Sequence, residues 1–196
     1  MTTRNVSLLR THDDRVIPVA GVYEIDGPHT SVEFVTRHLV ITKVRGRFND
    51  VRGRITIGED PESSHVEVQI ATRSLSTGSD DRDTHLRSAD FFDVDQFPWI
   101  TFISTAVRAR PDETWELDGD LTVRDVTRKV TLHVEFDGAA MSPFGDERIG
   151  FTAATNVERE DFGLTWNVAL EAGGLLIDKT ARIELAVQAI ARRDEA

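Results

Sequence analysis

The residues that could do chemistry concentrate in one short stretch, SDDRDTHLRSADFFDVDQFPWITF, at residues 79–102. Arg82, Asp83 and His85 combine a cation, a carboxylate and an imidazole, and such groups serve general acid–base catalysis. Adjacent residues on a helix diverge, however, and this spacing does not bring the three groups onto one substrate atom. No G-x-S-x-G motif supplies a nucleophilic serine elsewhere in the chain. The stretch therefore favours helix capping and ion pairing over catalysis.

The same stretch carries the pattern of a short helix near residues 80–90. Asp80 can cap the helix N-terminus, and Asp83 adds negative charge to the first turn, where the helix dipole favours it. His85 and Arg87 fall towards the C-terminal end, where positive charge is favoured. We therefore expect one short, well-capped helix.

Metal and thiol chemistry find no support in the residue types. The chain has six histidines and no cysteine, which excludes disulfides, thiol nucleophiles and zinc–thiolate sites. No two histidines stand in an H-x-H, H-x3-H or H-E-x-x-H arrangement. We expect no metal site and no cofactor.

The elements around the helix read as strands. From Tyr23 on, apolar and polar residues alternate with period two in about eight segments; in HVEVQIAT, Val66, Val68 and Ile70 share one face. One-sided alternation is typical of an antiparallel sheet with one face in water. Eight such strands either pair into a sandwich or close into a barrel, whose interior holds side chains or one ligand.

Composition and charge exclude several classes of partner. A chain of 196 residues with 39% hydrophobic residues suits a single domain of good size. The formal net charge of −11 argues against nucleic acid or anionic membrane surfaces as primary partners. No apolar stretch approaches the roughly 18 residues of a membrane span. Charged residues also interrupt every candidate secretory signal. We therefore expect a cytoplasmic protein without stable membrane insertion. The sequence leaves open whether the protein forms a homodimer.

The pattern along the chain divides it into three parts. Residues 1–20 lack sustained periodicity and are expected to be a loose N-terminal arm. Residues 21–190 are expected to form the barrel domain, followed by a C-terminal tail at residues 191–196.

Four motifs resemble the successive signatures of the YceI-like family. In chain order, across about residues 22–188, they are YEIDGPHTSVEFVTRHLVITKVRGRF, RDTHLRSADFFDVDQFPWITF, LDGDLTVRDVTRKVTLHV and FTAATNVEREDFGLTW. The resemblance implies an all-β fold, an extended eight-stranded antiparallel lipocalin-like barrel with a short helix. It also implies binding, storage or transport of a long apolar chain, such as a polyisoprenoid, an isoprenoid quinone or a fatty amide or acid. No catalytic activity is generally ascribed to the family.

We predict that such a ligand contacts the inward-facing residues of the strands and the aromatic pair after the helix. One of Phe91 and Phe92 is expected to enter the interior while the other packs outside. A second group is expected to be a structural cluster that holds the helix beside the barrel: Arg82, Asp83, His85, Leu86 and Arg159. The predicted ligand-binding residues are Val32, Phe34, His38, Ile55, Val68, Ile70, Phe91, Phe92, Ile100, Phe102, Leu121, Leu132, Val134, Phe151 and Leu185.

Two other functions stay open from the sequence. The protein could be an enzyme acting on a lipid-like substrate, with His38, Asp83 or His85 as the proton-transfer group. It could also be a ligand-free structural or stress protein whose barrel is filled by its own side chains. Alternation reports which face is apolar, and it does not distinguish a hollow interior from a solid one.

Overall fold

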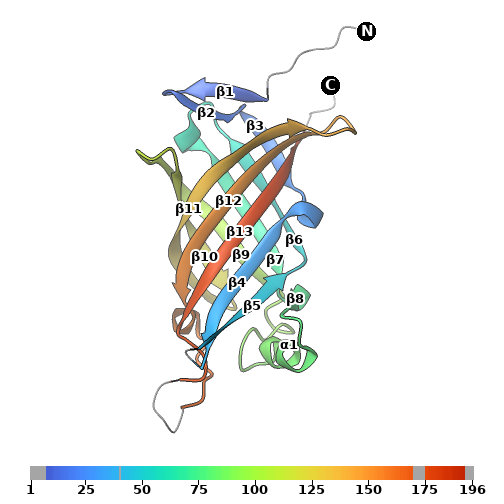
Figure 1. The fold of residues 1–196 in the computed structure, drawn as a ribbon, viewed down its shortest axis with the longest axis vertical. Coiled ribbons are helices and arrows are strands. Elements are labelled where there is room, and N and C mark those ends of the chain that lie inside the picture. The colour runs from blue at the N-terminus through green and yellow to red at the C-terminus, as the bar shows by residue number, and fades with distance from the viewer. Residues whose placement is uncertain (1–7, 40, 170–174, 193–196) are drawn as a thin grey trace.

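The alternating segments pair into a closed antiparallel barrel of eight strand positions (Figure 1). The computed structural model describes residues 8–39, 41–169 and 175–192. The expected barrel fold is thus confirmed. Its wall is made of β3 (Gly21–Ile25), β4 (Ser31–His38), β5 (Thr42–Phe48), β6 (Val51–Ile57), β7 (His65–Ala71), β9 (Trp99–Ala109), β10 (Trp115–Val123), β11 (Val126–Met141), β12 (Glu147–Glu158) and β13 (Thr180–Ala191).

Ten labelled strands fill eight positions because two positions are bent. β3 and β4 follow each other along β13 and are separated by the 3-10 turn η1 (Gly27–His29). β5 and β6 follow each other in the same way and pair with β4 and β3. Each position then pairs with the next along the chain, and β13 closes the barrel by pairing with both β12 and the β3–β4 strand.

The two ends of the barrel carry different elements (Figure 1). We call the end where β6 and β9 finish the hairpin end, since a two-stranded hairpin lies there. The other end, where β4 and β7 finish, carries α1 (Asp80–Arg87) and is called the helix end. There the chain also forms η3 (Thr72–Ser74), β8 (Leu75–Ser76) and η4 (Arg159–Phe162), while η2 (Pro61–Ser63) joins β6 to β7 at the hairpin end.

The helix lies where the sequence predicts it, but its cap differs from the expectation. α1 begins at Asp80, so this residue lies in the first turn and Ser79 is the N-cap, without a side-chain capping bond. Asp83 instead turns back and accepts hydrogen bonds from the amide and hydroxyl of Thr77. The helix is therefore anchored to the segment before it rather than capped by Asp80.

The hairpin at the other end comes from the segment that the sequence pattern predicts to be a loose arm. β1 (Leu9–His12) and β2 (Arg15–Pro18) pair with each other, and Ile17 is only 3% exposed. In LRTH and RVIP apolar and polar residues do not alternate, so the pattern gives no sign of these two strands. Residues 1–7 of the expected arm and residues 193–196 of the expected tail lie outside the described residues.

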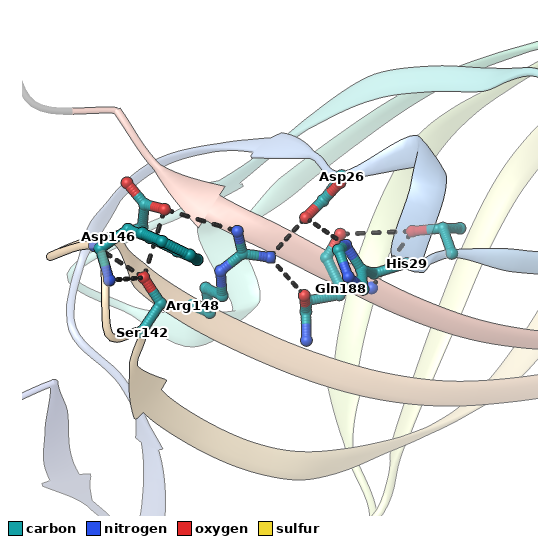
Figure 2. Close-up of polar contacts among 8 residues, drawn as sticks. Asp26, His29, Ser142, Asp146, Arg148 and Gln188 are labelled. Atoms are coloured by element: carbon teal, nitrogen blue, oxygen red, sulfur yellow. Dashed lines mark hydrogen bonds and ion pairs between the residues drawn. The ribbon is translucent and has the colours of Figure 1, made fainter.

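A polar cluster on the outer wall joins three strands near the hairpin end (Figure 2). Arg148 on β12 donates hydrogen bonds to Asp26, just after β3, and to Gln188 Oε1 on β13 at 2.6 Å. Asp26 Oδ2 also lies 2.9 Å from Nδ1 of His29. Burial alone would raise the pKa of Asp26, but hydrogen bonds from Arg148 and His29 outweigh burial and hold that pKa below its usual value. The cluster thus ties the bend between β3 and β4 to the neighbouring wall.

Candidate functional site

The interior of the barrel contains an apolar cavity of about 200 Å³. Side chains from all the wall positions contribute to its lining, because every second residue of each strand faces inward. The lining residues that the sequence predicts are Val32, Ile55, Val68, Ile70, Phe102, Leu121, Leu132, Val134, Phe151 and Leu185.

The chemistry of this lining is almost entirely hydrocarbon. In the described part of the chain, no charged side chain and no histidine lines the cavity; the polar side chains present are Thr30, Ser64 and Thr155. Contact between such a surface and an apolar ligand lowers the free energy, whereas burial of a charged group against it is strongly unfavourable. The cavity is therefore suited to binding a hydrocarbon, and its described lining includes no carboxylate, amine or imidazole that could transfer a proton.

Five predicted ligand-binding residues do not line the cavity. Ile100 is buried in a packed cluster at the helix end. Phe34 and Phe92 both pack on Phe48. The ring centroid of Phe48 lies 5.9 Å from that of Phe34 and 5.6 Å from that of Phe92. Phe91 packs away from them, on His85 and Trp166. His38 ends β4 and forms a bridge with Ile177.

The two aromatic side chains after the helix face different partners, and neither of them lines the cavity. Phe92 faces the packed cluster that includes Leu75 and Phe162, and Phe91 faces α1. Both side chains close the helix end of the barrel. Their role as ligand contacts stays a prediction, and this structure gives it no support.

Several cavity residues were missed by the sequence reasoning. Trp115 continues the inward face of β10 towards the hairpin end, and a longer reading of the alternation would have found it. Val107 lies on β9 beyond the register shift between β9 and β10, where the alternation changes, so period two does not point to it. Pro61 belongs to η2. Ile17 and Pro18 come from the N-terminal hairpin, and no local signal in the sequence points to them.

The predicted structural cluster is spread over two contact networks at the helix end. Arg82 donates to Thr77 through its Nε at 2.7 Å and its Nη2 at 2.9 Å, next to Asp83. His85 packs edge-on against Trp166, with ring centroids 4.5 Å apart, and lies 3.0 Å from Asp90. Leu86 packs on the apolar cluster beneath the helix.

Arg159 forms the second network and is 6% exposed. Its guanidinium donates to the carbonyl oxygens of Asp178 at 2.9 Å and Trp166 at 3.0 Å, and also to that of Leu164. Burial lowers the pKa of Arg159, because it disfavours the charged form. These bonds connect η4 with the segments that follow it. Trp166 links the two networks, so their members lie near one another without forming one ion-pair cluster.

One group of side chains has the order of a nucleophilic triad. Ser104 Oγ lies 3.0 Å from His65 Nδ1, and His65 Nε2 lies 3.2 Å from Glu67 Oε1. Ser104 is only 5% exposed, however, and its Oγ already accepts the amide of Val66 at 2.8 Å. This bond lies beside the register shift between β9 and β10, where the hydroxyl replaces a backbone acceptor. The Ser104 hydroxyl therefore supplies the acceptor that the Val66 amide needs beside the bulge, and it is too buried to act as a nucleophile.

Within residues 8–39, 41–169 and 175–192, no group of three or more His, Cys, Asp or Glu side chains could hold a metal ion. None of the helices within these ranges is both long enough and apolar enough to cross a membrane.

Comparisons with known proteins match most of the chain. The family model described as YceI-like domain matches residues 23–189. The UPF0312 protein PputGB1_5030 of Pseudomonas putida (strain GB-1) is 39% identical over 149 residues, which are 74% of this chain and 78% of that protein.

Solved structures agree with this match. The YCEI protein of Campylobacter jejuni superposes with a TM-score of 0.68 at 26% identity, over 80% of this chain and 90% of that one. A polyisoprenoid binding domain from Saccharophagus degradans has a TM-score of 0.64 at 17% identity, over 89% and 100% of the two chains, and shows the same fold.

Proposed function

The chain belongs to the YceI-like family, and from this premise we propose that it binds one long, linear apolar molecule inside its barrel and stores or transports it. The candidate ligands are a polyisoprenoid, an isoprenoid quinone and a fatty amide or acid. The observation that carries the proposal is the cavity itself, which is hollow and lined by hydrocarbon. The domain from Saccharophagus degradans supports the proposal at the level of the fold, since it has the same fold and is described as a polyisoprenoid binding domain.

The magnitude of the hydrophobic effect favours a long ligand. Burial of each methylene contributes about 0.8 kcal/mol, whereas association costs at least several kcal/mol. A chain of a few carbons would therefore barely bind, while one of about fifteen or more could bind tightly. Affinity is expected to rise with chain length until the space is filled.

We infer that the protein is not an enzyme. The three candidate proton-transfer groups, His38, Asp83 and His85, lie outside the cavity lining. Asp83 and His85 have partners in Thr77 and Asp90 that account for their positions. A filled barrel without a ligand is the competing hypothesis, and the hollow interior disfavours it.

The test begins with the purified protein. Organic extraction followed by mass spectrometry is expected to find one apolar ligand, and titration with prenyl alcohols and fatty amides of graded length is expected to give affinities that climb with length. An empty extract combined with flat, weak affinity across the series would contradict the proposal. Turnover of a lipid substrate that is lost in His85→Ala while the fold is retained would favour the enzyme instead.

A further inference from the structure

We propose that the N-terminal hairpin β1–β2 belongs to the ligand site as a lid, which swings away from the barrel when an apolar chain enters or leaves. This inference rests on the proposed function. The hairpin precedes the region matched by the family model, residues 23–189, so the shared domain does not include it. Its residues Ile17 and Pro18 nevertheless line the cavity.

The size of the cavity is the first reason to expect movement. An engineered apolar cavity of roughly 150 Å³ holds a benzene molecule, so each carbon takes on the order of 25 Å³. By this ratio a chain of about fifteen carbons needs on the order of 400 Å³, twice the 200 Å³ of this cavity. A long ligand therefore needs more space than this cavity offers, and displacement of Ile17 and Pro18 would supply it.

The way in which the hairpin is attached is the second reason. Within the described residues, β1 and β2 form their own two-stranded sheet and pair with no strand of the barrel. Two arginine side chains hold the hairpin on the rim instead. Arg10 donates to the carbonyl oxygens of Gly58 and Glu59, at 2.5 and 2.6 Å, beyond the end of β6.

The second arginine reaches a different part of the rim. Arg15 donates to the carbonyl oxygens of Arg110 and of Thr114, the latter at 3.3 Å, in the turn between β9 and β10. Its guanidinium carbon also lies 5.2 Å from the ring centroid of Trp115, a favourable cation–π contact. These contacts can break one by one without disturbing the barrel ladder, so Arg10 and Arg15 act as latches.

A short connection provides the pivot between lid and barrel. Gly21 has a φ of 157°, a conformation that L side chains rarely adopt. Beside it, the Tyr23 hydroxyl donates to the carbonyl of Val19 at 2.9 Å. Burial and the nearby Glu147 raise the pKa of Tyr23, which keeps its phenol protonated as a donor. The base of the hairpin is thus fixed, whereas its body is held by the two latches and by the apolar contacts of the buried Ile17 and Pro18.

Among the residues that the structure describes, the opposite end of the barrel does not offer an equivalent passage. Leu75 is fully buried there, and Phe48, Phe162 and Leu164 pack with it in one apolar cluster. Removing such a plug would cost the packing energy of several large side chains. The hairpin end is therefore the route with the lower barrier.

Stopped-flow binding of cis-parinaric acid, a naturally fluorescent long-chain fatty acid, tests the lid. In the natural protein the observed association rate is expected to level off as probe concentration rises, because lid opening limits it. In the double variant Arg10→Ala, Arg15→Ala the plateau and the dissociation rate are both expected to rise at least about tenfold, since charge-assisted hydrogen bonds are lost. Arg128→Ala removes an exposed arginine at the helix end and serves as the matched control with unchanged rates.

The outcomes separate the lid from the proposed function. A plateau that is absent, or identical in the natural protein and the double variant, overturns the lid while probe binding itself still supports the proposed function. No fluorescence response in any of the proteins overturns both.

A spin label gives a second readout that does not depend on the double variant being folded. The chain has no cysteine, and Val16 on the lid is 59% exposed, so Val16→Cys can carry a nitroxide. Saturation with cis-parinaric acid is expected to change the spectrum of this label. A label on His133→Cys, exposed on the outer wall, is expected to stay the same. An unchanged spectrum at Val16→Cys with the probe bound overturns the lid.

Discussion

At the helix end of the barrel, Leu75 and Phe162 are buried in a continuous apolar cluster, whereas at the hairpin end Ile17 and Pro18 cover a hollow. The first end is closed by close packing, which resists any change in volume. The second is closed by the hairpin β1–β2, whose Arg10 and Arg15 side chains donate hydrogen bonds to backbone carbonyl oxygens at the end of the barrel. Within the described residues, the helix end is thus closed by a packed core, whereas the hairpin end is closed by a hairpin that can move at a lower cost in free energy.

The largest effect is expected at the boundary between the cavity and the packed end. Ile70 lines the cavity and also belongs to the packed cluster, so Ile70→Asp places a charge where no partner exists. An unpaired buried charge typically costs about 3–5 kcal/mol, and probe binding is expected to be lost with it. Urea unfolding and cis-parinaric acid titration would measure the two effects.

The neighbouring Gln69 provides the matched control for this change. Gln69 is exposed on the outer face and accepts a hydrogen bond from Arg52 Nε at 3.0 Å. Gln69→Asp keeps an acceptor there and is expected to alter stability by no more than about 0.5 kcal/mol. Equal losses in Ile70→Asp and Gln69→Asp would show that the inner and outer faces are assigned wrongly.

The next effect compares the two closures directly. Leu75→Ala is expected to lower the free energy of unfolding by about 2–5 kcal/mol. Ile17→Ala is expected to cost less than half as much, because the hairpin pairs with no barrel strand among the described residues and can undock without unfolding the barrel. Urea midpoints of the two variants give the comparison. A larger loss in Ile17→Ala would mean that the hairpin is part of the core and not a cover.

A smaller effect concerns the polar cluster that ties the bend near the hairpin end. The pKa of Asp26 is lowered in the folded protein, so its carboxylate adds stability above its ordinary pKa, and this stability is lost as pH falls through the folded pKa. Asp26→Asn is expected to cost about 1 kcal/mol near neutral pH and nothing once Asp26 is protonated. Unfolding midpoints across an acid pH series measure this convergence.

The helix end supplies the control for the pH series. Asp125 is an exposed carboxylate in the turn between β10 and β11, and Asp125→Asn is expected to leave the midpoint near that of the natural protein throughout. If the gap between Asp26→Asn and the natural protein did not narrow on acidification, the ion pair with Arg148 would not be the cause.

The smallest effect is a shift in one pKa with little change in stability. Hydrogen bonds from Arg108 and then from Thr131 lower the pKa of Asp118 from 3.8 to about 2. Arg108→Gln is expected to raise the pKa of Asp118 most of the way back to its ordinary value, and Thr131→Val is expected to raise it by a smaller amount. Carbon NMR titration of the Asp118 carboxyl group measures both. An unmoved pKa in Arg108→Gln would contradict the assignment of these wall contacts.

Local alternation was sufficient to predict the wall of the barrel and much of its lining. In β7, Val68 and Ile70 face the cavity as their spacing requires, and Leu132 and Val134 do so in β11. The reason is that a strand sends alternate side chains to opposite faces whatever its partners are. Local charge and capping patterns likewise predicted the position of α1 to within a few residues. They did not predict that Asp83 would bond to Thr77 or that Asp80 would not cap the helix.

How far the barrel is hollow was decided only by the tertiary structure. Phe34 and Phe92 come from distant segments and meet on Phe48, so they fill space instead of lining the cavity. Ile17 closes the other end from a segment without any periodic pattern. Alternation is a property of neighbours along the chain, whereas a cavity is the space left after side chains from every strand have packed, and no single stretch of sequence contains that sum.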